Sequence, residues 1–168
     1  PFPYTTLFRS ATGDVSNRKH NVINSLFIDP DLCYENNLHM AKKYAAMEEN
    51  EVRFEEIGVE DAEVVFVSYG TPSRVARAAM KLLEKQGVKA GLFRPITLWP
   101  FPTKRLYEGA CKQNVKAVVA VEMSLGQMVD DVRIAVNGAK PVGFLGTAGG
   151  VIPTPADVAA TALKQLGR

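Results

Sequence analysis

The chain has 168 residues, of which 46% are hydrophobic and 23% charged, and its formal net charge is +2. These totals are typical of a globular protein with a buried core, and they exclude the basic stripe of a nucleic-acid-binding protein and the long apolar run of a membrane span. The two cysteines stand far apart without C-x-x-C spacing, which excludes an iron–sulfur or zinc cluster built from cysteine alone. Lone cysteines without a visible signal peptide favour the reducing cytoplasm.

Residues 1–10 (PFPYTTLFRS) resemble a translated sequencing adapter, so we exclude them from the reasoning on the fold. The chain begins without methionine, which leads us to expect a fragment of a longer protein. We expect residues 11–60 to form a linker with one helix and a connecting strand. Asp29 and Pro30 suit the N-cap and the first position of that helix, and residues 52–57 alternate imperfectly, as an edge strand does.

Residues 61–168 alternate apolar, strand-like runs with amphipathic helical patterns. The expected strands are residues 64–69, 88–93, 117–121 and 141–145, and the expected helices start after residues 73, 102, 124 and 153. Near-continuous apolar strands separated by helices predict an α/β domain, with a parallel sheet and helices on both faces. The apolar spacing places Tyr107 and Leu125 on the buried faces of the second and third of these helices.

The segment from Arg94 to Pro102 (RPITLWPFP) follows the second of these strands. Its three prolines lack a backbone donor, and each biases the residue before it toward extended geometry. We therefore expect a stiff, apolar, polyproline-like arm that carries Trp99, the only tryptophan. Such an arm is better suited to packing against another surface than to catalysis.

The carboxyl ends of parallel strands meet at one edge of a sheet, where ligands and partners bind. Here those ends are residues 69–71, 94–95, 122–124 and 146–150. The turn at residues 70–73 (GTPS) lacks the spacing of a phosphate-binding loop, so a strand–helix turn with a Ser or Thr cap is favoured over an anion site. The glycine-rich residues 146–150 are favoured as a flexible contact loop.

Glu122 ends a buried strand, so its carboxylate needs a partner. Arg94, at the end of the strand expected to be its neighbour, is the candidate for a structural ion pair; the alternative is a carboxylate that reaches into a site shared with another domain. The histidines, His20 and His39, have no nucleophile or carboxylate at a catalytic spacing. The residues predict a glycine-bearing edge without a complete catalytic set.

Three segments carry a resemblance to a known family: residues 62–70 (AEVVFVSYG), 91–102 (GLFRPITLWPFP) and 121–133 (VEMSLGQMVDDVR). They resemble the C-terminal part of the alpha subunit of the 2-oxoacid:ferredoxin oxidoreductases. That part is similar to the C-terminal domain of transketolase, a three-layer α/β sandwich. Residues 21–29 (NVINSLFID) resemble the branched-chain, 2-oxoisovalerate members.

The resemblance implies oxidative decarboxylation of a 2-oxoacid to an acyl-CoA, with thiamine diphosphate, Mg and iron–sulfur clusters in the whole complex and none bound by this fragment. The implied partners are an upstream pyrimidine-binding domain of the same subunit, a thiamine-diphosphate-binding beta subunit, a gamma subunit and ferredoxin, without nucleic acid or membrane. No catalytic residue is carried over. The candidate contacts with the missing domain or subunit are Gly70, Thr71, Arg94, Pro95, Trp99, Phe101 and Glu122.

Three other interpretations stay open. In the first, the chain is the matching domain of another thiamine enzyme. In the second, it is a free-standing flavodoxin-like module that binds a phosphate or a nucleotide. In the third, it is a regulatory binding domain without an enzymatic role. Tight binding of a phosphate ligand by the isolated chain would favour the flavodoxin-like module.

Overall fold

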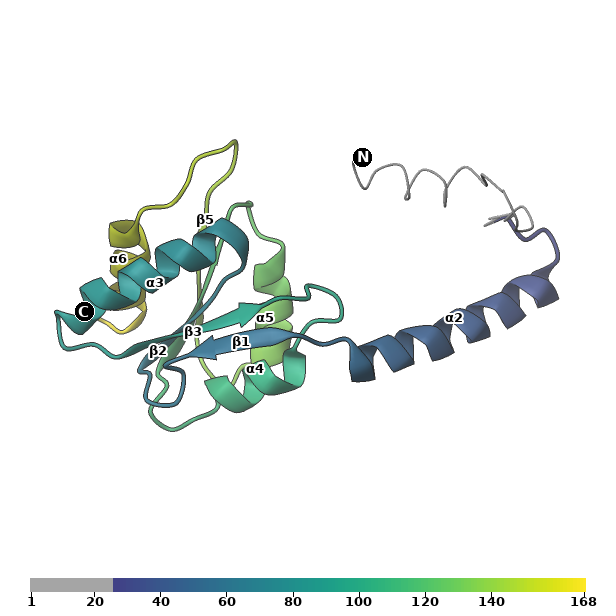
Figure 1. The fold of residues 1–168 in the computed structure, drawn as a ribbon, viewed down its shortest axis with the longest axis horizontal. Helices are drawn as coiled ribbons and strands as arrows, with labels where there is room; N and C mark the ends of the chain where they lie inside the picture. The colour runs from purple at the N-terminus through teal and green to yellow at the C-terminus, as the bar shows by residue number, and fades with distance from the viewer. Residues whose placement is uncertain (1–25) are drawn as a thin grey trace, which may run out of the picture. The chain divides into compact units, whose positions relative to one another are not determined.

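The computed structural model describes residues 26–168. The expectations for residues 1–10 and for the linker before residue 26 lie outside the described residues. The chain divides into two compact units after Lys43, and the second unit, residues 44–168, holds the α/β domain (Figure 1).

Helix α2 (Pro30–Asn50) begins where the sequence predicts. The Asp29 carboxylate accepts hydrogen bonds from the backbone N–H groups of Asp31 and Leu32 at 2.8 and 3.3 Å, as an N-cap does. None of the side chains of α2 is buried. In the described part of the chain, no helix has both the length and the apolar character needed to cross a membrane.

Five strands form one sheet in the order β1-β3-β2-β4-β5. Their bounds are Phe54–Ile57 (β1), Val64–Val67 (β2), Ala90–Pro95 (β3), Ala117–Glu122 (β4) and Val142–Gly146 (β5). Strands β2 to β5 are parallel, and β1 pairs antiparallel with β3 at the edge. The structure thus confirms the predicted parallel sheet and its edge strand.

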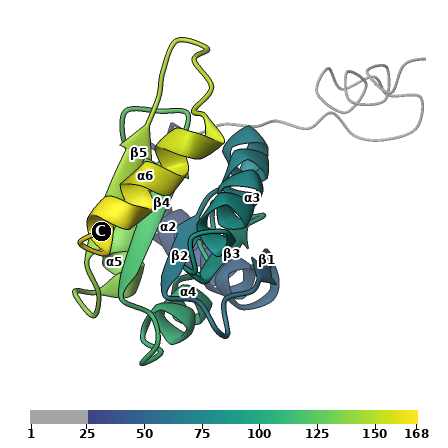
Figure 2. The ribbon, with the colours of Figure 1, turned by 90° about the vertical axis from the view of Figure 1, so that its left-hand side faces the viewer.

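Four helices cover the sheet: α3 (Gly70–Glu84), α4 (Thr103–Ala110), α5 (Met128–Val136) and α6 (Pro155–Gln165). Helices α3 and α6 pack on one face, and α4 and α5 on the other (Figure 2). On β2, Val65 and Val67 point toward α4 and α5, whereas Val64 and Phe66 point toward α3 and α6. The three-layer α/β fold is therefore confirmed, and burial on both faces explains why this strand is apolar throughout.

Two of the expected burial positions are wrong. Tyr107 lies on the outer side of α4 and is 45% exposed. Leu125 is 83% exposed, because α5 begins only at Met128 and Leu125 belongs to the loop before it. Strand β3 also starts two residues later than predicted, because the Val88 N–H donates to the Leu83 carbonyl at 3.0 Å and belongs to the turn that ends α3.

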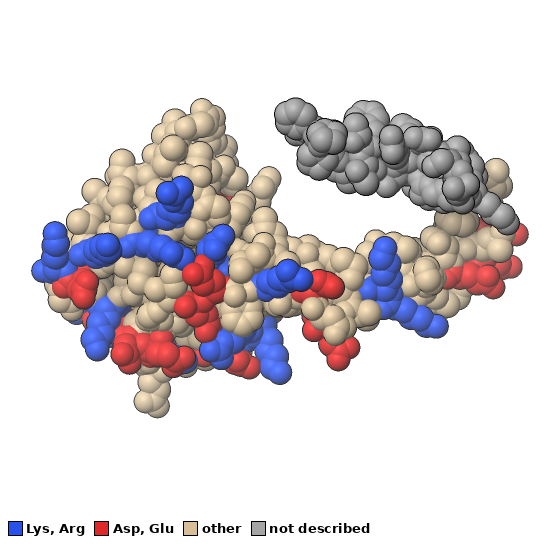
Figure 3. Space-filling view, in the orientation of Figure 1, with Lys and Arg blue, Asp and Glu red and all other residues tan. Residues whose placement is uncertain are grey.

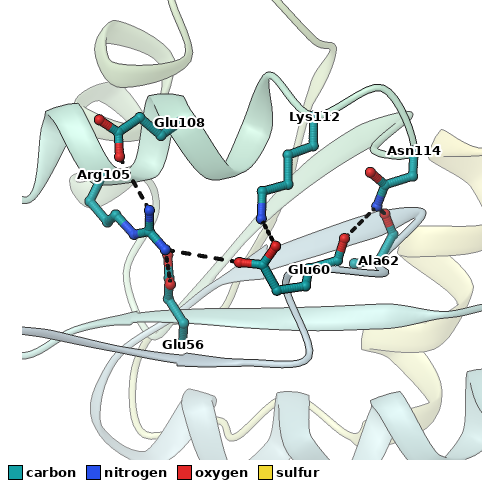
Figure 4. Close-up of polar contacts among 7 residues, drawn as sticks. All are labelled: Glu56, Glu60, Ala62, Arg105, Glu108, Lys112 and Asn114. Carbon is teal, nitrogen blue, oxygen red and sulfur yellow. Dashed lines mark hydrogen bonds and ion pairs between the residues drawn. The ribbon is translucent and has the colours of Figure 1, made fainter.

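A polar cluster joins the β1 strand and the β1–β2 connection to α4 and the turn after it (Figure 4). Arg105 donates to Glu56 at 2.8 Å, and Lys112 donates to Glu60. The Asn114 amide donates to the backbone carbonyl of Glu60 at 3.0 Å. The hydrogen bond with Glu56 raises the pKa of Arg105, and the hydrogen bond from Lys112 lowers the pKa of Glu60. These contacts hold the antiparallel edge strand in place.

Candidate functional site at the carboxyl edge of the sheet

The carboxyl ends of β2 to β5 lie at one edge of the sheet, and exposed apolar side chains gather there. Within residues 44–168, only Tyr107 on α4 and Ile134 on α5 are large, apolar, exposed and away from this edge. The other large, exposed apolar residues of this range lie at the edge, and they are Tyr44, Phe54, Ile96, Leu98, Trp99, Met123, Leu125, Val151 and Ile152. A clustered apolar surface of this kind marks an interaction site in a soluble protein.

The arm of residues 96–102 begins as an extension of the sheet. The backbone N–H groups of Ile96 and Thr97 donate to the Arg53 carbonyl at 2.9 and 3.1 Å. The arm then bends instead of running on as the straight, polyproline-like rod that we expected, and the peptide bond between Trp99 and Pro100 is cis. The hydrogen bonds to Arg53 and the burial of the last two prolines hold it against the domain.

Trp99 forms the exposed tip of the arm and is 52% exposed. Its ring meets the ring of Tyr44 edge-on, with centroids 5.4 Å apart. Phe101, by contrast, is half-buried against the core on the α4–α5 face. An open hollow of about 760 Å³ lies beside the arm, and its lining includes Trp99, Phe101 and Asp131. The arm therefore presents one large aromatic side chain next to a recess.

Glu122, the last residue of β4, is fully buried and caps α5. Its carboxylate accepts hydrogen bonds from the backbone N–H groups of Gln127, Met128 and Val129 at 3.2, 3.0 and 3.2 Å. The Ser124 hydroxyl donates to it at 3.0 Å. The carboxylate thus sits at the positive end of the helix dipole, where anionic groups are stabilised.

The expected ion pair between Glu122 and Arg94 is wrong, because β2 separates β3 from β4. Arg94 instead donates to Glu55 on β1 at 3.0 Å, and Glu55 also accepts from Arg77 on α3 at 2.9 Å. The hydrogen bond from Arg94 lowers the pKa of the Glu55 carboxyl. Arg94 therefore links the edge strand to the sheet, while Glu122 caps α5, the next helix along the chain.

Gly70 and Thr71 are exposed where β2 passes directly into α3. Gly70 has a φ of +58°, in the left-handed region that favours glycine, so the sharp turn explains this residue. The N-cap residue is Tyr69, and its side chain forms no capping hydrogen bond, so the expected Ser or Thr cap is not found. The Ser73 hydroxyl donates to the Gly70 carbonyl at 2.7 Å instead.

Of the other candidate contact residues, Arg94 is half-buried, whereas Pro95 and Glu122 are buried. Val151 and Ile152 were not among the candidates predicted from the sequence, and Leu125 was predicted to be buried, yet all three are among the most exposed apolar residues of the edge. One sequence signal for Val151 and Ile152 is the absence of any charged residue from position 141 to position 156.

Potential metal-ligating side chains are scattered in the described part of the chain. Across residues 26–168, no three His, Cys, Asp or Glu side chains stand together in a way that could hold a metal ion. We therefore derive no chemical step through the magnesium ion or the iron–sulfur clusters that the resemblance implies for a whole complex. Both cysteines in this range, Cys33 and Cys111, are free thiols.

Comparison with known proteins relates the chain to ferredoxin-linked oxidoreductases. The family model for the pyruvate:ferredoxin oxidoreductase core domain II matches residues 62–158. The ketoisovalerate oxidoreductase subunit VorB of Methanothermobacter marburgensis is 47% identical over 133 residues, which cover 77% of this chain and 36% of that protein. The 2-oxoglutarate synthase subunit KorA of the same organism is 36% identical over 99 residues, covering 59% of this chain and 26% of that protein.

Two solved structures have a similar fold. A chain of the 2-oxoglutarate:ferredoxin oxidoreductase from Magnetococcus marinus matches with a TM-score of 0.65 at 20% identity, covering 90% of this chain and 27% of that one. A split-gene transketolase in the form of an inactive beta4 tetramer matches with a TM-score of 0.59 at 26% identity, covering 68% of this chain and 41% of that one.

The chain spans about a third of the length of the two ketoisovalerate oxidoreductase subunits VorB that it matches. The family model, however, covers more than half of the chain and includes β2 to β5 and the whole carboxyl edge between Tyr69 and Ile152. The chain therefore belongs to the pyruvate:ferredoxin oxidoreductase core domain II family.

Proposed function

We propose that this chain is part of a subunit of a 2-oxoacid:ferredoxin oxidoreductase of the ketoisovalerate type. Such an enzyme oxidises a branched-chain 2-oxoacid to an acyl-CoA with loss of carbon dioxide, and passes the electrons to ferredoxin. The substrate proposal is supported by the 47% and 46% identity to two ketoisovalerate oxidoreductase subunits, against 36–38% to the 2-oxoglutarate synthase subunits.

Within that enzyme we propose an assembly role for this part. The observation that carries it is the concentration of exposed apolar side chains at the carboxyl edge, where the two candidate charged residues are already used inside the domain. We propose that Gly70, Thr71, Trp99 and Phe101 contact the rest of the enzyme. Pro95, Arg94 and Glu122 contribute by holding the strand ends and the next helix in position.

The proposed partners are a further domain of the same polypeptide, which binds the pyrimidine side of thiamine diphosphate, a beta subunit that binds the diphosphate, a gamma subunit and ferredoxin. Thiamine diphosphate, magnesium and the iron–sulfur clusters belong to those parts. We propose the cytoplasm as the location, since lone free thiols such as Cys33 and Cys111 are typical of a reducing compartment.

A chimeric subunit tests the function. The part of VorB from Methanothermobacter marburgensis that matches this chain is replaced by this chain and combined with the other subunits of that enzyme. We expect ferredoxin reduction that depends on coenzyme A and is faster with 2-oxoisovalerate than with 2-oxoglutarate. A chimera that assembles and prefers 2-oxoglutarate would contradict the substrate proposal. Tight binding of inorganic phosphate or a nucleotide by the isolated chain would instead favour a free-standing binding module.

A further inference from the structure

Two loops form a second apolar surface at the carboxyl edge, apart from the Trp99 arm. The β4–α5 loop, residues 123–127, exposes Met123 and Leu125, and the β5–α6 loop, residues 147–154, exposes Val151 and Ile152. Both loops leave the same edge side by side in two perpendicular views (Figures 1 and 2). We call these four residues the loop patch.

The two loops are joined closely at their base. The register of the sheet places Glu122 beside Gly146, and the Thr147 N–H donates to the Glu122 carbonyl at 3.1 Å. A side chain at Gly146 would stand 2.4 Å from the Ser124 carbonyl oxygen, so only glycine permits this approach. Both loops therefore leave the sheet from one shared, tightly packed site.

The Glu122 carboxylate fixes the β4–α5 loop in particular. It binds both ends of the loop, through the Ser124 hydroxyl at 3.0 Å and the Met128 N–H at 3.0 Å, and the Gly126 N–H donates to the Ser124 oxygen at 3.2 Å. Leu125 stands between these anchored residues and is 83% exposed. A large apolar side chain on a well-anchored loop is pre-organised for binding, because little conformational freedom is lost on contact.

The loop patch is surrounded by uncharged sequence. No Asp, Glu, Lys or Arg occurs from residue 123 to residue 129 or from residue 141 to residue 156. In Figure 3 the projecting β5–α6 loop accordingly carries no charged side chain, whereas the body below it carries many. Depletion of charge is typical of the core of a lasting protein interface, and it does not fit nucleic acid, a phosphate group or a charged peptide.

We propose that the loop patch docks into an apolar, uncharged recess on another domain of the same polypeptide. This inference rests on the proposed function, since it requires the longer subunit. The chain spans 36% of the ketoisovalerate oxidoreductase subunit, so roughly two-thirds of such a polypeptide lies outside it and is available to cover the patch. We expect the recess to lack charged side chains, as the loop patch does, because an unpaired charge would be buried at the contact.

A second copy of this chain fits the loop patch less well. Figure 1 shows the β5–α6 loop projecting beyond the end of the sheet. In a two-fold dimer the same patch faces itself, so the two projecting loops meet tip to tip. That arrangement buries little of the roughly 800 Å² per partner that a stable interface requires. A recess on a different domain receives the same loop with much more contact.

Cysteine labelling tests the proposal in the isolated chain and in the chimeric VorB described above. In a background of Cys33→Ser and Cys111→Ser, Leu125→Cys is introduced, with Ile134→Cys on α5 as a matched control that is 71% exposed. The readout is the rate of maleimide labelling at the introduced thiol. We expect both thiols to react rapidly in the isolated chain, and Leu125→Cys alone to react at least 10-fold more slowly in the chimera before other subunits are added.

Equal reactivity of the two thiols in the chimera would overturn the proposal. So would protection that appears only when the other subunits are added, or protection in the isolated chain that grows with its concentration, which would indicate a partner subunit or a second copy. A chimera that reduces ferredoxin while Leu125→Cys stays reactive separates failure of this inference from failure of the proposed function.

If the chimera does not fold, carbene footprinting of unmodified VorB from Methanothermobacter marburgensis tests whether the corresponding loop is covered within that subunit. The segment of VorB aligned with residues 123–126 is expected to be labelled at least 5-fold less than the segment aligned with the outer face of α5. Equal labelling of the two segments would overturn the proposal.

Discussion

Replacement of Glu122 by alanine is expected to destabilise the domain severely, although Glu122 takes no part in the proposed contacts. The change removes the acceptor of three backbone N–H groups at 3.2, 3.0 and 3.2 Å and of the Ser124 hydroxyl at 3.0 Å. A hydrogen bond to a charged acceptor contributes about 1.5–3 kcal/mol, and leaving a buried donor unpaired costs about 1–3 kcal/mol. Because water can enter the space left by the side chain, these costs do not add fully.

We therefore expect a loss of about 3–5 kcal/mol, the range seen when one partner of a buried charged contact is removed. For a chain of this length about 1 kcal/mol corresponds to roughly 3 °C in Tm, so Tm should fall by about 9–15 °C. Thermal and urea unfolding followed by circular dichroism measure both quantities.

Ser124→Ala is the matched control, because it removes one neutral donor to the same carboxylate and leaves the three backbone contacts in place. We expect it to cost about 1.5 kcal/mol, the lower end of the range for a hydrogen bond to a charged acceptor, because Ser124 is only half-buried. Glu122→Gln should fall between the two, since one carbonyl oxygen remains while the new amide N–H₂ faces other donors. If Glu122→Ala lies within about 1 kcal/mol of Ser124→Ala, the carboxylate is not the cap that the geometry indicates, and the reasoning is refuted.

In the chimeric subunit, Trp99→Ala should weaken association with the partner subunits by roughly 2 kcal/mol or more, about 30-fold in Kd. In the isolated chain, the same change should alter Tm little. A large loss of Tm with unchanged association would place Trp99 in the core instead. Gly146→Ala should cost about 1–3 kcal/mol in urea unfolding, because the new Cβ meets the Ser124 carbonyl oxygen and the Phe144 ring. Gly143→Ala should cost less, because its new Cβ meets only the flexible side chain of Gln165; equal costs would contradict this. Partial desolvation, followed by its acidic neighbours, raises the pKa of the exposed Asp131, so its ionisation opposes folding as pH rises above 3.8, and Asp131→Asn should raise Tm slightly at pH 7 but not at pH 3. The hydrogen bond from the Lys116 ammonium lowers the pKa of Glu63, so this pair should lose its contribution to Tm as pH falls below 4.5, and Glu63→Gln should show a smaller acid-induced loss than the unmodified chain.

Local patterns in the sequence were sufficient for the elements and the fold class. Asp29 and Pro30 predict the start of α2, and Thr154 and Pro155 that of α6, because capping depends on a few adjacent residues. The apolar run of β2 predicts a strand covered on both faces, because water is excluded from both sides of it. The proline-rich sequence after Arg94 likewise predicts that regular structure ends there, although not the bend that follows.

The order of the strands decided what the local patterns could not. Arg94 and Glu122 both end parallel strands, and pairing them is reasonable until β2 is found between them. Likewise, Leu125 follows the helical spacing of α5, but the Glu122 carboxylate sets the first turn of that helix at Met128 and leaves Leu125 outside it.

The sequence by itself determined which segments are buried, where most helices begin and that the strand ends share one edge, because these properties depend on apolar periodicity and on neighbouring residues. Only the tertiary structure decided which partner each charged group takes and which apolar residues remain exposed, among them Trp99, Leu125 and Ile152. Both depend on strand order and loop geometry, which bring together residues far apart in the chain, and no local spacing encodes such distances.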